Sequence, residues 1–416
     1  MTPAILSLLA LLVVIGFSLT ARINVGVLAV ALAWPIAVFA AGWKTEALMA
    51  VFPSGLFLTL LGVTLLFGIA HKNGTLEVIA RHATAACGGV TGLLPIAFFA
   101  LACGVSTFGP GAIAATALIA PLAMSTGATA GVPAFLMALM VANGGNAGNL
   151  SPFSAVGVIV QSLLVKIGLG GHEWGVFSAN FVAHALVAAA AYMLFGGLPL
   201  WRLGRGAGAI VEPPPSFASR HVFTCAVIAL WIAAVVVWRT NPGLSAFAAA
   251  AVLIIARAAD DTTVVGAVPW SVILMVCGVS VLVGVIEKTG GMDLFTTLLA
   301  RITSPATANG MMAFVTGVIS TYSSTSGVVY PAFLPAVPGL VEKLGGGDPL
   351  EIALSINVGA AIVDVSPLST IGALCIAALP NAAEARVLFR QMLLWGFAMT
   401  VVGAVFCQLA IRFFAF

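Results

Sequence analysis

The chain has 416 residues, of which 61% are hydrophobic and 7% are charged, and its formal net charge is +3. A typical soluble domain has about 25% charged residues, so this composition excludes a soluble globular protein and gives no support to nucleic-acid binding. Apolar stretches recur along nearly the whole chain, and many approach the roughly 20 residues that a helix needs to cross the hydrocarbon core. These stretches are apolar on all sides, whereas strands of a membrane barrel alternate apolar and polar residues. The sequence therefore predicts an all-α polytopic membrane protein.

The first half of the chain is predicted to hold three spans, a surface helix, a pair of apolar helices with a polar tip, an interrupted span and a last span. In this order they lie at residues 4–20, 25–41, 52–70, 75–86, 90–125, 132–166 and 175–199. The first span lacks the basic start and the small-residue cleavage site of a secretory signal, so we expect it to be retained. If the pair at 90–125 dips into the membrane and returns, this half crosses it five times.

The second half repeats the motifs of the first half in the same order. The segment RINVG at 22–26 returns as RTNPG at 239–243, and a set of single residues returns at the same spacing. These residues are Pro53, Gly62, Lys72 and Gly74 in the first half, and Pro269, Gly278, Lys288 and Gly290 in the second. The halves therefore read as two copies of one helical repeat. An odd number of crossings places the second copy upside down in the membrane, which is the design of many secondary transporters.

We therefore expect two inverted five-span repeats, each with a re-entrant hairpin and a broken helix, giving about 10 transmembrane helices plus 2 hairpins. The predicted parts are residues 1–200 for the first repeat with its hairpin at 90–125, residues 201–219 for a linker, and residues 220–416 for the second repeat with its hairpin at 307–342. Arg202, Arg205 and Arg220 favour a cytoplasmic linker under the positive-inside rule. Both termini would then be periplasmic, in a bacterial-type inner membrane.

Two polar turns stand at equivalent positions of the halves, STFGPG at Ser106–Gly111 and STYSSTSG at Ser320–Gly327. Each is flanked by apolar helices, and Gly109, Pro110 and Gly111 do not continue a helix well. Non-helical backbone at membrane depth persists only where it is buried in protein or lines a water-filled cavity. Hydroxyl groups and the positive end of the following helix would then attract a carboxylate. The alternative is a packing hairpin or a turn outside the membrane.

A second pair of polar segments interrupts the span that follows each hairpin, at Asn143–Ser154 and Asn357–Thr370. Uncompensated amides and hydroxyls are costly in the middle of a membrane. Carbonyl and side-chain oxygens at such helix breaks are common ligands for sodium, a hard cation that prefers oxygen. The alternative is that these polar groups join neighbouring helices by hydrogen bonds.

Asp364 is the one acid that the predicted spans place at mid-membrane depth, where a charge costs at least about 2.5 kcal/mol. Ionised, it would help to hold a cation, and protonated, it would carry a coupling proton. The alternative is a neutral structural carboxyl group. The counterpart in the first half lies around Asn149, which is uncharged, so the two cation sites would differ in charge.

No arrangement of residues in the sequence indicates an enzyme. Serines are plentiful, but no histidine or acid is placed to activate one at the same depth. His184 lies in an apolar run and is expected to be packed rather than to relay protons. The six cysteines are scattered singly, without the spacing of a metal site. No cofactor is expected, apart from Na+ as a possible coupling ion.

The N-terminal part, from the segment 42–80 through the segment 148–157, resembles MatC-type dicarboxylate (malonate) carriers, and the likeness spans roughly residues 1–195. More distantly, the architecture is similar to the divalent anion:sodium symporters of the ion transporter superfamily, which carry Ser-Asn-Thr at each hairpin tip. Here Ser106-Thr107-Phe108 and Ser320-Thr321-Tyr322 stand nearby, without the asparagine. The resemblance implies a homodimer in which a moving transport domain carries substrate past a fixed scaffold, an elevator mechanism.

These observations predict cation-coupled uptake of a small dicarboxylate, with malonate or a four-carbon acid as the leading cargo and Na+ or H+ as the coupling ion. The residues expected to bind substrate are Ser106, Thr107, Gly109, Pro110, Gly111, Ser154, Ser323, Ser324, Thr325 and Ser369. Those expected at cation sites are Asn143, Asn146, Asn149, Ser151, Asn357, Asp364, Ser366 and Thr370. The alternatives are a carrier for another anion, a cation/proton antiporter, and a channel or membrane scaffold.

Overall fold

A computed structural model describes residues 1–18, 23–86, 90–109, 111–202, 215–238, 240–322, 324–379 and 381–416. Within these ranges the chain forms helices joined by short connections, and no β-strand is present. The predicted all-α architecture is therefore confirmed. Pro110, Ser323 and most of the predicted linker at 201–219 lie outside the described residues.

The first half begins with helices that follow the predicted order of elements. They are α1 (Pro3–Ser18), α2 (Val25–Pro35) with its π-helical continuation Ile36–Ala40, α3 (Thr45–Met49), α4 (Ser54–Lys72), α5 (Thr75–Ala86), α6 (Leu93–Thr107), α7 (Ala112–Thr129), α8 (Ala134–Gly148), α9 (Ala155–Lys166), α10 (Glu173–Leu194) and α11 (Gly197–Arg202). The gap between α6 and α7 is the predicted hairpin tip, and the gap between α8 and α9 falls inside the predicted interruption.

The second half presents a similar series. It contains α12 (Ser219–Val237), α13 (Pro242–Ile255), α14 (Asp261–Gly266), α15 (Trp270–Thr289), α16 (Gly291–Ile302), α17 (Ala308–Tyr322), the π-helical turn η2 (Thr325–Val329), α18 (Tyr330–Phe333), η3 (Leu334–Ala336), α19 (Val337–Leu344), α20 (Pro349–Ala361), α21 (Thr370–Ala377), α22 (Ala382–Ala410) and η4 (Ile411–Phe414). The returning arm of its hairpin is thus broken into short pieces, which the sequence did not indicate.

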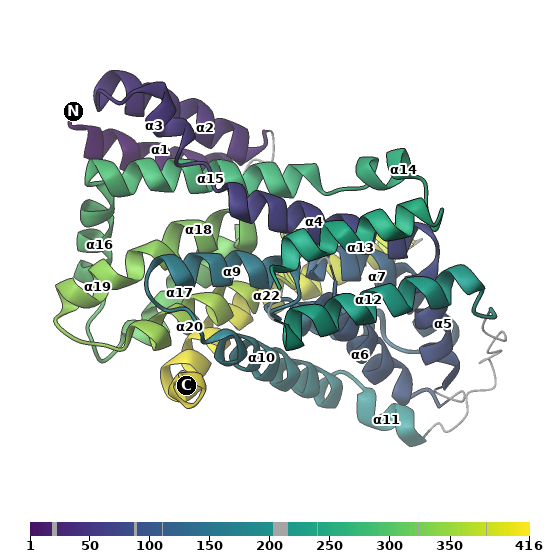
Figure 1. Cartoon of the computed structure of the whole chain (residues 1–416). Coiled ribbons are helices and arrows are strands. Elements are labelled where there is room, and N and C mark those ends of the chain that lie inside the picture. Colours follow the sequence, from purple (N-terminus) through teal and green to yellow (C-terminus); the bar gives the residue numbers. More distant parts are fainter. Residues whose placement is uncertain are drawn as a thin grey trace.

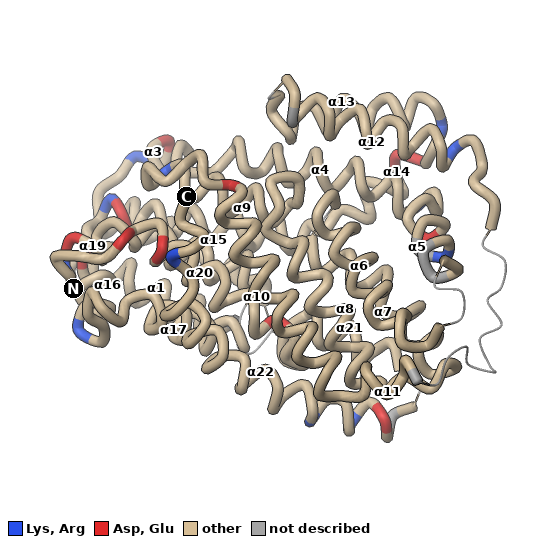
Figure 2. The backbone as a smooth tube through the Cα atoms, turned by 90° about the horizontal axis from the view of Figure 1, so that it is seen from below, with Lys and Arg blue, Asp and Glu red and all other residues tan. Residues whose placement is uncertain are grey.

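Five helices of the described chain have the length and apolar composition to cross a membrane: Ser54–Lys72, Ala112–Thr129, Glu173–Leu194, Trp270–Thr289 and Ala383–Phe414. Seven further apolar helices are 10–17 residues long. Figure 2 shows charged residues gathered mainly at the two ends of the bundle, near α3, α16 and α19 at one end and near α5, α11 and α14 at the other. This distribution supports a multi-pass membrane protein, since charges are costly at membrane depth.

The repeated motif RINVG/RTNPG starts a helix in each half. The side chain of Asn24 accepts a hydrogen bond from the nitrogen of Gly26 (2.9 Å), and the side chain of Asn241 accepts one from the nitrogen of Gly243 (3.0 Å). Asparagine is favoured at this position because its side-chain oxygen satisfies a main-chain N–H that has no partner within the helix. The motif therefore fixes the start of α2 and of α13.

The glycines of these motifs pack against the other half of the chain. A Cβ atom on Gly26 would lie 2.1 Å from the carbonyl oxygen of Leu274, and one on Gly278 would lie 2.2 Å from the oxygen of Gly26. The same close packing of glycines is found between α13 and α4, where a Cβ atom on Gly62 would lie 2.3 Å from the oxygen of Gly243. Each half thus packs one helix against the long helix of the other half: α2 packs against α15, and α13 packs against α4 (Figure 1).

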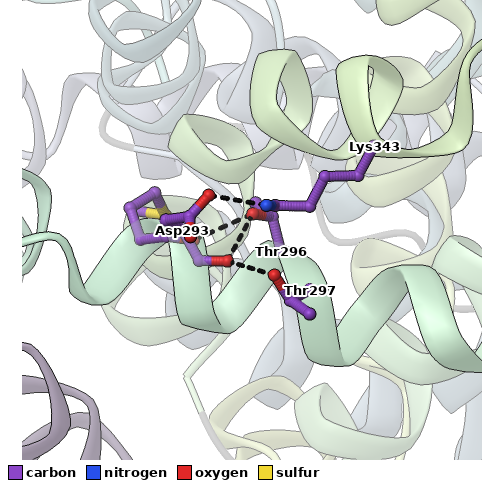
Figure 3. A network of polar contacts seen from close by, with 5 residues as sticks. Asp293, Thr296, Thr297 and Lys343 are labelled. Atoms are coloured by element: carbon purple, nitrogen blue, oxygen red, sulfur yellow. Dashed lines mark hydrogen bonds and ion pairs between the residues drawn. The ribbon is translucent and has the colours of Figure 1, made fainter.

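A surface helix follows the long helix in each half, and the two surface helices are held differently. In the second half the amine of Lys343 on α19 lies 2.6 Å from a carboxylate oxygen of Asp293 on α16. Figure 3 shows this ion pair, with the main-chain oxygen of Asp293 accepting hydrogen bonds from Thr296 and Thr297. The equivalent acid on α5, Glu77, pairs within its own helix with Arg81. The ion pair therefore joins α16 to the hairpin arm only in the second half, among the described residues.

Candidate functional site

A cavity of about 260 Å³ is lined by the helices that flank the first hairpin tip, by the second tip, by both helix breaks and by the helices α4 and α15. We call residues 106–111 and 320–327 the first and second tip, and residues 149–154 and 362–369 the first and second break. Most of the lining is apolar. The polar lining residues are Thr64, His71, Asn149, Ser324, Thr325, Ser326, Asp364, Ser369 and Thr370.

The first tip is joined to the first break by the side chain of Asn149. Its amide oxygen accepts a hydrogen bond from the main-chain nitrogen of Ala112, the first residue of α7 (2.8 Å). Gly111 precedes this residue with φ +93°, and a Cβ atom there would lie 2.9 Å from the same amide oxygen. The left-handed backbone and the close contact both require glycine. The main-chain nitrogen of Ala155 adds a longer contact to the oxygen of Gly109 (3.4 Å).

The second tip is joined to the second break by a hydroxyl and a carboxylate. The Thr325 hydroxyl donates a hydrogen bond to Oδ1 of Asp364 (2.6 Å), and Ser320 and Thr325 are in contact through their hydroxyls (2.5 Å). With the Thr325 hydrogen directed at the carboxylate, Ser320 donates in that contact. Asp364 is 8% exposed, so it sits in a poorly hydrated place. Hydrogen bonds to a charged acceptor are stronger than those between neutral groups.

Each break is closed by a serine at the start of the next helix. The hydroxyl of Ser154 accepts a hydrogen bond from the nitrogen of Gly157 (2.9 Å) and donates one to the main-chain oxygen of Asn149. Ser369 does the same in the second half, with the nitrogen of Gly372 (3.4 Å) and the main-chain oxygen of Asp364. The two serines thus satisfy backbone groups that the interrupted helices leave open, as N-cap residues do.

Six of the residues predicted for substrate or cation binding line the cavity: Asn149, Ser324, Thr325, Asp364, Ser369 and Thr370. The other described ones lie outside its lining. Thr107 is close to Cys103 (3.8 Å between Oγ1 and Sγ), while Ser151 and Ser366 accept hydrogen bonds from the nitrogens of Phe153 and Leu368 within their own turns. Ser106 is fully buried, and its hydroxyl has no partner among the described residues.

Two of the predicted residues on α8 contact α10, Asn143 through its side chain and Asn146 through its main-chain oxygen. The side-chain oxygen of Asn143 lies 3.0 Å from Nδ1 of His184, and the amide of Asn180 donates to the main-chain oxygen of Asn146 (2.6 Å). Asn143, Asn146 and His184 are fully buried, as is Asn357 on α20. His184 is packed, as the sequence predicts. The Asn143 side chain joins α8 to α10, which was the alternative interpretation of the polar interruptions. The side-chain amides of Asn146 and Asn357 have no hydrogen-bond partner among the described residues.

The sequence analysis missed three polar lining residues, Thr64, His71 and Ser326. Thr64 and His71 belong to a stripe on α4 with Leu60 and Phe67, at spacings of three and four residues. Such spacing places side chains on one face of a helix. The stripe could therefore have predicted which residues of α4 line the cavity, provided that α4 was known to face a site. Ser326 adjoins Thr325 in the second tip.

Asp364 is the only acidic group among the described lining residues, and no lysine or arginine is among them. The described chain contains no cluster of three or more His, Cys, Asp or Glu side chains that could hold a metal ion. A cation in this cavity would therefore depend on Asp364, together with hydroxyl and main-chain oxygens of the second tip and break. Oxygen donors of this kind suit a hard cation.

Comparison with known proteins gives a family match for part of the chain and a similar fold for most of it. Residues 1–149 match the family described as dicarboxylate carrier protein MatC, N-terminus. Among solved structures, the YdaH transporter of Alcanivorax borkumensis has a similar fold, with a TM-score of 0.59 and 15% sequence identity over 88% of this chain and 87% of that chain. A search of curated protein sequences gives no match.

The fold and the matched family support a membrane transporter rather than an enzyme, as the sequence analysis predicted. The resemblance to MatC-type carriers is confirmed for residues 1–149.

Proposed function

We propose that this protein is a secondary active transporter that takes up a small carboxylate anion together with a cation, either Na+ or H+. The first candidate cargo is a small dicarboxylate such as malonate or a four-carbon acid, because residues 1–149 match a dicarboxylate carrier family. The observation that carries the proposal is the Asp364–Thr325 contact within a cavity of about 260 Å³ that the second tip and both breaks line.

Coupling follows from the charge of Asp364. A cargo carboxylate that reached Ser326 or Thr370 would share the cavity with the Asp364 carboxylate. Two negative charges repel strongly at short distance in a poorly hydrated site. A cation or proton on Asp364 removes this repulsion, so that cargo and cation each raise the affinity for the other.

The proposal includes an architecture. Residues 1–200 and 220–416 form two inverted five-span repeats, and residues 201–219 connect them on the cytoplasmic side, with both termini in the periplasm. The protein is a homodimer in a bacterial-type inner membrane. The lining combines residues of the long helices α4 and α15 with residues of the second tip and both breaks. We infer an elevator mechanism in which the second tip and the breaks move with the cargo while α4 and α15 stay fixed.

Uptake of labelled malonate or succinate into proteoliposomes tests the proposal. We expect concentrative uptake when an inward Na+ or H+ gradient is imposed, and no uptake without protein. Asp364→Asn should lose or change the cation dependence. If no carboxylate accumulates under either gradient, the proposed function is wrong.

A cation/proton antiporter is the second candidate, because Asp364 alone could exchange a proton for Na+ within the same cavity. Such a protein would change the internal pH of vesicles when Na+ is added without an organic anion. The proposed symporter would give a pH change or Na+ flux only when the carboxylate is also present. Sustained single-channel currents would instead indicate a channel.

A further inference from the structure

We propose that the start of α22 binds an anionic phospholipid. Arg386 and Arg390 hold its headgroup, and its acyl chains lie along an exposed apolar stripe of the same helix. We call this the α22 site. It shares no lining residue with the cavity, so it goes beyond the proposed transport function and does not depend on the identity of the cargo.

The headgroup would occupy a surface hollow of about 350 Å³ between α21 and the first turns of α22. Its lining residues are Ile376, Ala385, Arg386, Phe389 and Arg390. The four that belong to α22 are spaced so that they share one face of the helix. The hollow therefore presents two guanidinium groups beside apolar side chains, and no acid is among its described lining residues.

The two arginines are exposed, and neither has an ion pair or hydrogen bond in the described part of the chain. Arg386 and Arg390 are four residues apart, and like charges at this spacing destabilise a helix. No acid stands three or four positions from either arginine, and Glu384 accepts a hydrogen bond from the amide of Asn381 (3.3 Å). An anion between the guanidinium groups would relieve their repulsion and accept hydrogen bonds from both.

An exposed apolar stripe continues from the arginines along α22. Leu394, Val401, Val405 and Leu409 are each more than half exposed. Their spacing of four or seven residues keeps them along the side of the helix on which the arginines lie. A pair of positive charges at the end of a long apolar stripe matches a phospholipid, which joins an anionic headgroup to acyl chains. A soluble anion would leave the stripe unused.

The α22 site lies at the end of the bundle where the predicted linker begins. The ring of Trp395 on α22 contacts the ring of Phe195, two residues before α11, with 5.4 Å between the centroids. Under the positive-inside rule this end is the cytoplasmic one. Anionic lipids give the cytoplasmic leaflet its negative surface potential, so the expected ligand is present at that surface.

Two phospholipids with the same short acyl chains test the inference on the intact protein. In a thermal-shift titration in a non-ionic detergent, we expect phosphatidylglycerol to raise the Tm at a concentration about tenfold or more below that needed for phosphatidylcholine. Inorganic phosphate and glycerol phosphate at the same concentrations should have no effect, because they lack acyl chains. Equal effects of the two lipids would overturn the inference. Stabilisation by phosphate alone would also overturn it, since it would indicate a site for a soluble anion.

Variants of the two arginines locate the effect. Arg386→Gln combined with Arg390→Gln should abolish the preference for phosphatidylglycerol. Arg301→Gln is the matched control, because Arg301 is an exposed arginine of α16 with no partner among the described residues. It should leave the preference unchanged. A preference retained in the double variant, or lost equally in the control, would contradict the proposal.

A second measurement does not depend on thermal stability. In native mass spectrometry, the double variant should retain one phosphatidylglycerol molecule fewer per chain than the unchanged protein. If the double variant does not fold, the single variants Arg386→Gln and Arg390→Gln replace it, and each should weaken the preference by about threefold or more. An unchanged preference in both single variants would overturn the inference.

Discussion

At the first tip a neutral amide oxygen, from Asn149, accepts a hydrogen bond from the main-chain nitrogen of Ala112, whereas at the second tip a carboxylate, from Asp364, accepts one from the hydroxyl of Thr325. Both contacts join a hairpin tip to the neighbouring helix break. The first can form without any bound ion, since both partners are neutral. The second contains a buried acid, whose ionised form is costly without a partner. The first tip is therefore suited to structure, and the second to binding.

The largest effect is expected from Asp364→Asn, which makes the second side resemble the first. The amide still accepts the hydrogen bond from Thr325, so the fold should survive. Loss of a contact between a charge and a bound cation corresponds to about 10- to 100-fold. Carboxylate uptake should fall by this factor or become independent of the cation gradient, as measured in proteoliposomes. Asn149→Asp is the matched variant, and it should make the cation dependence steeper. Unaltered cation dependence in both variants would show that the charge difference has no role in coupling.

Gly111→Ala tests whether the first tip is structural. A Cβ atom would force a φ of +93° on alanine and approach the oxygen of Asn149 to 2.9 Å, so we expect a loss of about 1–3 kcal/mol in stability. Thermal unfolding in detergent would show a clear fall in Tm. Gly104→Ala is the control, because a Cβ atom at Gly104 meets nothing within 4 Å and alanine favours the helix. Equal behaviour of the two variants would contradict the structural role.

Ser154→Ala and Ser369→Ala remove the caps of the two breaks. Loss of an N-cap costs about 0.5–2 kcal/mol, so both variants should unfold at a lower temperature. The comparison predicts a further difference, because Ser369 also lines the cavity and Ser154 does not. Only Ser369→Ala should weaken carboxylate binding in titrations performed well below the unfolding temperature. A similar binding defect in Ser154→Ala would weaken the distinction between the two sides.

Lys343→Ala should have the smallest effect. The ion pair with Asp293 is partly exposed, at 27% and 72% for the two side chains, and such pairs contribute at most about 1 kcal/mol. We expect a small fall in Tm that disappears at high salt concentration, because salt screens exposed charges. A large effect that persisted at high salt would mean that α16 depends on this contact far more than exposed charges allow.

The sequence was informative wherever local residue types decide the structure. Glycine and proline at residues 109–111 stop a helix regardless of what surrounds them, so the first hairpin and its tip could be located. The asparagine-glycine motifs at the starts of α2 and α13 were recognisable as a repeat because the asparagine caps its helix through contacts with residues close in sequence. Asp364 stood out because an acid is rare within an apolar span.

Which polar residues face the cavity could not be predicted. Asn143, Asn146 and Asn149 are three residues apart and look alike in the sequence, yet Asn143 contacts His184 on α10 and Asn149 contacts the first tip. Which asparagine contacts α10 and which contacts the first tip depends on the helices that pack against each face of α8 and on the residue at which α8 ends. Contacts between distant parts of the chain determine both. The stripe of Thr64 and His71 was passed over because α4 reads as an ordinary span.

The exchange of helices between the halves limits how the chain can assemble. Gly26 contacts Gly278 with no room for a side chain between them, and Gly62 contacts Gly243 in the same way. Each half therefore has a helix surface of bare backbone that is covered by a helix of the other half. Residues 1–200 made alone would expose the backbone around Gly26 and Gly62 to lipid or to another copy of the chain. Two separately encoded halves, produced together, should find each other and complete the same helix pairs. During synthesis, the first half must therefore wait in the membrane for the second before its long helix α4 can pack against α13.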